Sequence, residues 1–124
     1  MKKLCAISTL ALLLVAGCSL STTDKAIITA NEIHAIAESE RDIISSYCVP
    51  KYEEAKTDED IKNADKVCLP ARTAFYSTRA AWVALSSIIE ASKYGQASTQ
   101  DVQDAMIKLS SALTDLKKAM EDLK

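Results

Sequence analysis

The feature that most constrains the fold is a strictly periodic apolar pattern over the last quarter of the chain. Its members alternate at steps of four and three residues: Val102, Met106, Leu109, Leu113, Leu116, Met120 and Leu123. In an α-helix this spacing places every member on one face, whereas in a strand it would scatter them over two. A helix is therefore predicted here. It begins at the capping-box pattern of Ser98 and Asp101, and it needs neighbours to cover its apolar face.

A first helix is predicted over about residues 25–48. Small and branched apolar residues recur there mostly at three- and four-residue steps: Ala26, Ala30, Ile33, Ala37, Ile44 and Tyr47. Asp24 is the expected N-cap, because its short polar side chain accepts hydrogen bonds from the free backbone N–H groups of a first turn. Pro50 is expected to end the helix, because proline has no backbone N–H and its ring clashes with the preceding turn.

The middle of the chain is predicted to form two helices, one short and one long. The short helix covers about residues 58–68 and starts at a capping-box pattern of Thr57 and Asp60. Pro70 then begins the long central helix, since proline is tolerated in a first turn, and Gly95 ends it. The broad apolar arc of this long helix indicates that it lies at the centre of the fold.

These helices predict an all-α fold. We expect a small up-down-up bundle of three long helices and one short helix, formed by residues 24–124. The chain holds only 2 Gly and 2 Pro in 124 residues, a composition that favours helix. In this arrangement the end of the first helix, the short helix and Lys124 share one end of the bundle.

The N-terminal residues have the pattern of an export signal. Lys2 and Lys3 form a basic start, and an apolar run over 4–15 is followed by the small residues Ala16 and Gly17. A basic head, an apolar stretch and a small-residue cleavage site are typical of a secretory signal peptide. The apolar run is too short to span a bilayer, which needs about 20 residues. Residues 1–17 are therefore predicted to be a signal peptide.

The end of this segment, Leu14-Val15-Ala16-Gly17-Cys18, resembles the lipobox of bacterial lipoproteins. The resemblance covers only these residues. It implies cleavage by signal peptidase II before Cys18 and attachment of lipid to Cys18, which anchors the chain to a membrane. Residues 18–23 would then be a lipidated tether. Ser19 favours the outer membrane, facing the periplasm, over the inner membrane. The alternative is an ordinary signal peptide that leaves Cys18 free.

The cysteine count fits an exported protein. The chain has 4 Cys, of which Cys5 leaves with the signal peptide and Cys18 carries the lipid. The remaining two can form one intramolecular disulfide, Cys48–Cys68, in an oxidising periplasm. A bridge that closes a loop of this length contributes about 3 kcal/mol in the chain-entropy description.

Charge and residue chemistry exclude several function classes. Lys2 and Lys3 leave with residues 1–17. The remaining chain then has 13 of the 15 basic residues and all 17 acidic residues, which gives a net charge near −4. This balance argues against nucleic-acid binding, which needs a basic surface. His34 is the only histidine and is expected to be a solvated or flanking side chain that can pair with Glu38, without partners for base or metal chemistry. We expect no metal site, no cofactor and no catalytic residue, and so no enzyme.

Two groups of side chains are candidate binding surfaces. Arg72, Tyr76 and Arg79 recur at four- and three-residue steps and so share one face of the central helix. Around the predicted disulfide the candidates are aromatic and acidic: Tyr47, Tyr52, Glu53 and Glu54. Aromatic and arginine side chains are favoured at protein interfaces. The alternative for both groups is the ordinary solvated edge of a bundle.

These features predict a membrane-anchored envelope lipoprotein with a structural or protein-interaction role, an envelope protein as its partner and no catalysis. A bundle with no polar cluster inside binds by its surface. Two alternatives stay open. One is a lipoprotein that holds a small apolar ligand between its helices, near Phe75, Trp82 and Met106. The other is a phage-type lysis or exclusion lipoprotein.

Overall fold

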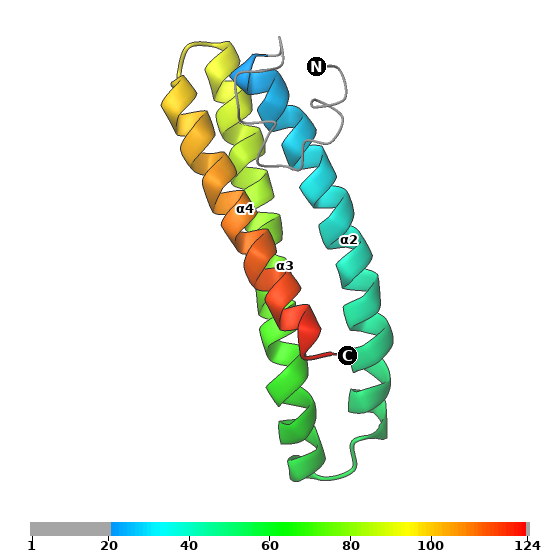
Figure 1. Cartoon of the computed structure of the whole chain (residues 1–124). Coiled ribbons are helices and arrows are strands. Elements are labelled where there is room, and N and C mark those ends of the chain that lie inside the picture. The colour runs from blue at the N-terminus through cyan, green and yellow to red at the C-terminus, as the bar shows by residue number, and fades with distance from the viewer. Residues whose placement is uncertain (1–20, 124) are drawn as a thin grey trace, which may run out of the picture.

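The computed structural model describes residues 21–123. The predicted signal peptide, Cys18 and Lys124 lie outside the described residues. The described part contains three α-helices: α2 (Thr22–Glu54), α3 (Asp58–Lys93) and α4 (Thr99–Glu121). Each helix runs antiparallel to the one before it (Figure 1). The all-α bundle with one disulfide is confirmed, whereas the expected short fourth helix is not present as a separate element among these residues.

The first correction concerns Pro50, which does not end the first helix. α2 continues through Pro50 to Glu54. An interior proline costs a helix about 3 kcal/mol relative to alanine, because it removes one backbone hydrogen bond and crowds the preceding turn. Here Cys48, two residues before the proline, is buried, and Tyr52, two residues after it, packs against the core. Tertiary packing on both sides therefore holds the helical path that local preference disfavours.

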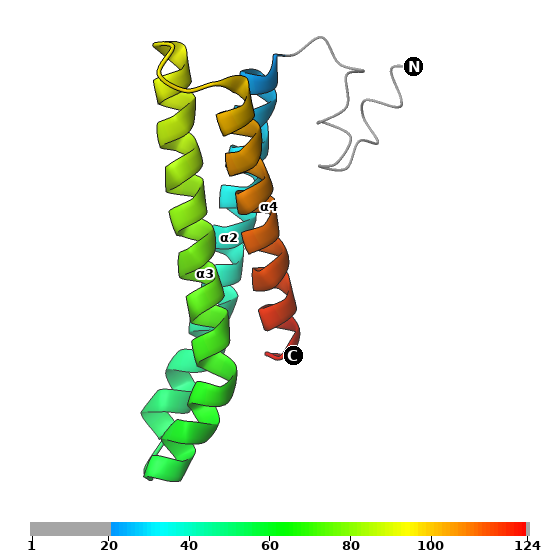
Figure 2. The ribbon, with the colours of Figure 1, turned by 90° about the vertical axis from the view of Figure 1, so that its left-hand side faces the viewer.

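The second correction concerns Pro70, which does not begin a new helix. The predicted short and central helices are one 36-residue helix, α3, with Pro70 in its interior. Figure 2 shows α3 running along the whole bundle. The side chains of Cys68 and Ala71 are both fully buried, while Pro70 between them faces solvent. Burial of apolar side chains on both sides of the proline keeps the chain helical through it.

Two of the three helices begin at the residues predicted from the sequence. Both predicted capping boxes are present: Thr57 with Asp60 at α3, and Ser98 with Asp101 at α4. At α2 the N-cap is Ser21 instead of Asp24, because the Ser21 hydroxyl accepts a hydrogen bond from the backbone N–H of Asp24 at 3.1 Å. The helix thus begins at Thr22, within the segment expected to be tether.

The end of α3 is also as predicted, because Gly95 adopts a φ of +70°. Only glycine takes this left-handed conformation without steric cost, and it follows a helix C-terminus very commonly. The backbone N–H of Gln96 then reaches back to the carbonyl of Ala91 at 2.9 Å. This closure turns the chain sharply towards α4.

The core lies along the axis of the three helices. All seven apolar positions of the last helix are at most 5 % exposed, as their spacing predicted. They pack against Ile33 and Ala37 of α2 and Leu85 and Phe75 of α3 in one continuous cluster. Such burial contributes about 25 cal/mol for each Å² of apolar surface removed from water, so the heptad pattern is the main source of the fold's stability.

α4 is shorter than its two neighbours and covers only part of their length (Figures 1 and 2). Its register against α3 is set by Thr78, whose Oγ1 lies 3.1 Å from the carbonyl oxygen of Ala112. Further along, Asp122 lines a groove with Asp65 and Lys66. α4 therefore ends level with the part of α3 around Cys68. Beyond that level, residues 49–67 of α2 and α3 form a two-helix hairpin, called the tip below.

Candidate interaction surface

The predicted disulfide is present and stands where the three-helix part of the bundle gives way to the tip. It joins Cys48 of α2 to Cys68 of α3, with a Cα–Cα distance of 5.9 Å, within the usual range of about 4.4–6.8 Å. Both residues are at most 3 % exposed. Each cysteine is followed by one apolar residue and a proline, Cys48-Val49-Pro50 and Cys68-Leu69-Pro70. The bridge thus fixes the two helices just before the point where each loses a backbone hydrogen bond.

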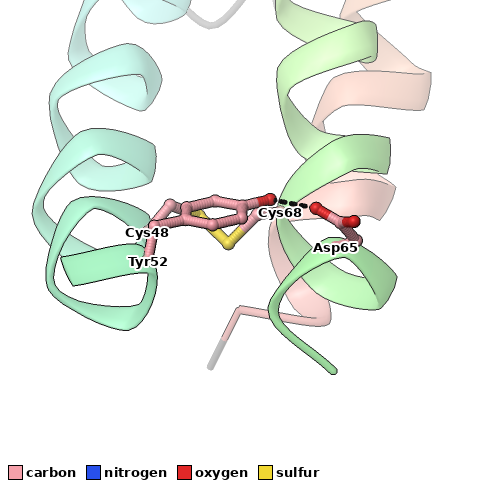
Figure 3. The surroundings of a disulfide bond; sticks show 4 residues. All are labelled: Cys48, Tyr52, Asp65 and Cys68. Atoms are coloured by element: carbon pink, nitrogen blue, oxygen red, sulfur yellow. Dashed lines mark hydrogen bonds between the residues drawn. A yellow bond between two sulfur atoms is a disulfide. The ribbon is translucent and has the colours of Figure 1, made fainter. Parts of the chain in front are cut away.

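A second link between α2 and α3 lies next to the bridge. The Tyr52 hydroxyl donates a hydrogen bond to Asp65 Oδ1 at 2.6 Å, and Figure 3 shows the Tyr52 ring reaching across from α2 beside the two sulfur atoms. This bond raises the pKa of Tyr52, because the Asp65 carboxylate holds the phenolic proton and burial adds to the effect. The positive charge of Arg72 nearby opposes the rise.

A pocket of about 290 Å³ opens between α2 and α3 on the side of Tyr52. Its apolar floor is made by side chains that also belong to the core: Ile44, Cys48 and Phe75. Its rim carries Arg41, Val49, Arg72 and Tyr76, all exposed, together with the half-buried Tyr52. The site therefore combines an apolar depression with two guanidinium groups at its edge.

The exposed stripe of α3 predicted from sequence continues from this pocket along the bundle. Arg79 and Val83 lie seven residues beyond Arg72 and Tyr76, two helical turns further along the same face. Tyr76 is 57 % exposed and Val83 50 %, so the stripe is accessible. We call the surface formed by Arg41 and Val49 of α2 and by Arg72, Tyr76, Arg79 and Val83 of α3 the α2/α3 face.

The guanidinium groups of this face differ in their pairing. Arg41 forms ion pairs with Glu38 at 2.9 Å and with Asp42 at 3.5 Å. Among residues 21–123, neither Arg72 nor Arg79 has a carboxylate oxygen within 4.0 Å. Arg72, which lies beside the Tyr52 hydroxyl, and Arg79 therefore have no ion-pair partner among these residues.

The candidates around the disulfide do not form one patch. Tyr52 joins Arg72 and Tyr76 at the pocket described above. Tyr47 and Glu54 instead line a different groove, on α2 and the start of α3, where Lys51 Nζ lies 4.7 Å from the centre of the Tyr47 ring. Glu53 is exposed and lines neither. Of these four candidates, only Tyr52 lies at the pocket that borders the α2/α3 face.

His34 is half-buried and flanks the core, which was one of the two predicted positions for it, but it does not pair with Glu38. Its ring stacks on Trp82 of α3, with ring centres 4.0 Å apart and planes 14° from parallel, and Glu38 pairs with Arg41 instead. A signal for this contact was present in the sequence. His34 lies fourteen residues before Cys48, and Trp82 lies fourteen after Cys68. In an antiparallel hairpin fixed by that disulfide, these two positions must face each other.

Within residues 21–123, no group of three or more His, Cys, Asp or Glu side chains is placed to hold a metal ion. None of the helices described has an apolar stretch of the length and character needed to cross a bilayer. Comparisons with protein-family models, with curated proteins and with solved structures find no match to this chain.

Proposed function

We propose that this chain is a lipid-anchored lipoprotein of the bacterial envelope that acts by presenting the α2/α3 face to another protein, without catalysis of its own. One observation carries the proposal. Arg72 and Arg79, which have no ion-pair partner among residues 21–123, share one face of α3 with the half-exposed Tyr76 and Val83, and this face borders an apolar pocket. Exposed apolar groups combined with arginine and tyrosine are characteristic of protein-binding surfaces.

The position of the proposed anchor would place the pocket and the tip at a distance from the membrane. Lipid on Cys18 would lie three residues from Ser21, which caps α2, a reach of about 10 Å. The 33 residues of α2 then extend for about 50 Å at 1.5 Å per residue. In this proposal α2 carries the tip and the pocket away from the lipid, where a partner from the periplasm or another envelope layer meets them first.

The anchor is tested by blocking its processing. With globomycin, which inhibits signal peptidase II, we expect an uncleaved precursor to accumulate, and Cys18→Ser is expected to abolish metabolic labelling with palmitate. Cys5→Ser serves as the matched control, because Cys5 belongs to the segment that is removed. A processed chain that stays in the aqueous phase without detergent would refute the lipoprotein proposal.

The interaction role is tested by a photo-crosslinking residue at Val83 in cells, with a second at Ile107 of α4, which is 64 % exposed. We expect a protein crosslink from Val83. The alternative of a small apolar ligand near Phe75 has less support: the pocket that reaches Phe75 has a volume of about 290 Å³, just below the range of about 300–1,000 Å³ that is usual for ligand sites. Phe75 and Met106 belong to the packed core, with Trp82 against it. Retention of a lipid or other apolar molecule through purification, with no protein crosslink, would favour that alternative.

A phage-encoded lysis or exclusion lipoprotein would use the same anchor and the same face. The two origins differ in the partner and in the phenotype of a deletion. Loss of the gene would then change host lysis or superinfection and leave the integrity of the envelope intact.

A further inference from the structure

We propose that the partner of the α2/α3 face is an acidic amphipathic helix, whose carboxylates pair with Arg72 and Arg79 while one large apolar side chain enters the pocket beside the disulfide. This inference rests on the proposed function and adds the chemistry of the partner to it. Three observations support it: the local charge, the spacing along α3 and the size of the pocket.

The α2/α3 face holds all three arginines of a chain that is acidic as a whole, with 13 basic and 17 acidic side chains over residues 18–124. Glu38 and Asp42 offset Arg41, and Asp65 keeps its negative charge where it accepts the Tyr52 hydroxyl. Among residues 21–123, however, neither Arg72 nor Arg79 has a carboxylate oxygen within 4.0 Å. Arg72 and Arg79 are therefore a positive site on a negative molecule, which attracts carboxylates and repels basic segments.

Guanidinium groups favour carboxylates in particular, because their planar donors match the two oxygens of one carboxylate. An anionic membrane would also carry negative charge. However, the positive site is confined to two side chains on a narrow face that also offers a pocket and apolar side chains. This combination fits a folded protein segment better than a lipid surface.

The spacing of the face matches a helix lying along it. Arg72 and Arg79 are seven residues apart, as are Tyr76 and Val83, which corresponds to about 10.5 Å along α3. Acidic residues two turns apart on a partner helix have the same repeat. Apolar residues three or four positions from them would meet Tyr76 and Val83. Recognition would then be of the helix-in-groove kind, with anchors at heptad spacing.

The pocket beside Tyr52 sets the size of the anchor. Its volume of about 290 Å³ suits one large apolar side chain, and its floor is formed by the core residues Ile44 and Phe75. The disulfide at Cys48 holds this floor rigid. Because a rigid pocket loses little entropy when it is filled, it is suited to the single buried anchor that dominates many interfaces.

The first experiment uses three synthetic helical peptides of the same length with the same leucines at heptad spacing, and with Glu, Gln or Lys at the flanking positions. Binding to the full lipidated chain in non-ionic detergent is measured by fluorescence anisotropy. We expect the Glu peptide to bind more tightly than the Gln peptide and the Lys peptide to bind weakest, with affinity for the Glu peptide falling as salt rises. Equal affinity for the three peptides would overturn the inference.

The variant Arg72→Glu/Arg79→Glu provides the matched test of the face. We expect it to weaken binding of the Glu peptide at least tenfold, whereas the control variant Lys108→Glu/Lys117→Glu, which reverses the same number of charges on α4, leaves binding within about twofold. Circular dichroism of both variants verifies that the bundle is intact. Loss of binding in the control alone would place the acidic partner on α4 and refute the inference.

The identity of what crosslinks to Val83 distinguishes failure of this inference from failure of the proposed function. A crosslinked partner peptide that is acidic and helical supports the inference. A basic peptide, a second copy of this chain, or a phospholipid recovered at Val83 would overturn it, as would selective binding of phosphatidylglycerol vesicles through Arg72 and Arg79. A protein crosslink from Ile107 alone would refute the α2/α3 face, and with it both the proposed function and this inference, whereas a basic partner peptide at Val83 would leave the proposed function standing. Protein crosslinks at neither position would refute both.

Discussion

The body of the bundle and its tip are held together by different forces. In the body three helices surround a continuous core, and side chains such as Leu85, Leu109 and Leu116 are completely buried. In the tip only α2 and α3 remain, and Val49 and Ile61 are 51 % and 43 % exposed. Two helices alone bury too little apolar surface to be stable. The tip accordingly depends on the disulfide at its base, on the Tyr52–Asp65 hydrogen bond and on the Thr57 capping box.

This difference bears on function as well as on stability. α4 covers one side of the α2–α3 pair and leaves the other side open, and the pocket lies on that open side where the body meets the tip. The disulfide fixes the separation of the helices at that place. The proposed binding site thus has a rigid base without a third helix to cover it.

The largest expected effect is in the body. Leu109→Ala removes a side chain with no exposure, and the lost burial and residual cavity should lower the free energy of unfolding by about 2–5 kcal/mol. The matched change in the tip, Ile61→Ala, should cost less than about 1 kcal/mol, because its side chain is 43 % exposed. Urea unfolding measures both. Equal losses would show that the tip contributes to the core as much as the body does.

The disulfide comes next. Its removal in Cys48→Ala/Cys68→Ala should cost about 3 kcal/mol and should loosen the tip more than the body. Hydrogen exchange is expected to accelerate over residues 49–67 and to stay slow over residues 102–120. Uniform acceleration along all three helices would contradict the division into body and tip. Because both sulfur atoms are buried, we expect the native bridge to resist mild reductants until the hairpin opens.

Much of the body was predictable from sequence, whereas in the tip the capping box at Thr57 was predicted but the continuous helical path was not. The spacing of Val102 to Leu123 predicted the buried face of α4, and Ser98, Thr57 and Gly95 marked three helix boundaries correctly. These signals are local or periodic, and packing agrees with them. The predicted helix ends at the two prolines were wrong. Around Pro70, the burial of Cys68 and Ala71 outweighs the local tendency of proline to end a helix, and this burial cannot be inferred from the residues next to the proline.

The candidate surface was predictable in part for the same reason. The prediction that Arg72 and Arg79 share one face was correct, because both residues belong to one helix and lie seven residues apart. Tyr52 was a candidate from sequence, but its position beside Arg72 was not foreseen, since it requires α3 to be continuous from Asp65 to Arg72, across the proline that was expected to interrupt it. The His34–Trp82 stack needed the register between two helices, which only the disulfide supplies.

A smaller effect is expected from the hydrogen bond across the tip. Tyr52→Phe removes the donor to Asp65 and should cost about 1 kcal/mol. The wild-type bond also depends on pH. Folding raises the pKa of Tyr52, so the stabilisation is complete below the unfolded value of 10.0 and is lost as pH rises through the higher folded value. The difference in melting temperature between wild type and Tyr52→Phe should therefore be constant from pH 7 to 9 and shrink above pH 10. A constant difference up to pH 11 would contradict this assignment.

The smallest expected effects come from the two capping boxes, which share one chemistry but stand in different surroundings. In each, a hydroxyl accepts the backbone N–H of an aspartate at 3.1 Å, and that aspartate accepts the N–H of the cap residue, at 3.0 Å for Asp60 and 2.8 Å for Asp101. Ser98→Ala should lower the free energy of unfolding by about 1 kcal/mol, since α4 unfolds together with the core. Thr57→Ala should have a smaller global effect and should mainly speed hydrogen exchange at the start of α3, because the tip opens locally.

Acid provides the matched test of these two caps. Backbone hydrogen bonds lower the pKa of both Asp60 and Asp101, so each stabilisation is present above the unfolded value of 3.8 and is lost as pH falls through the lower folded value. Titration from pH 6 to 2 should therefore remove most of the difference in global melting between wild type and Asp101→Ala, and most of the difference in local exchange between wild type and Asp60→Ala, because these variants lack the carboxylate that titrates. If Thr57→Ala lowered global stability as much as Ser98→Ala does, the tip would unfold with the body, and the disulfide would act on the whole bundle instead of on its end.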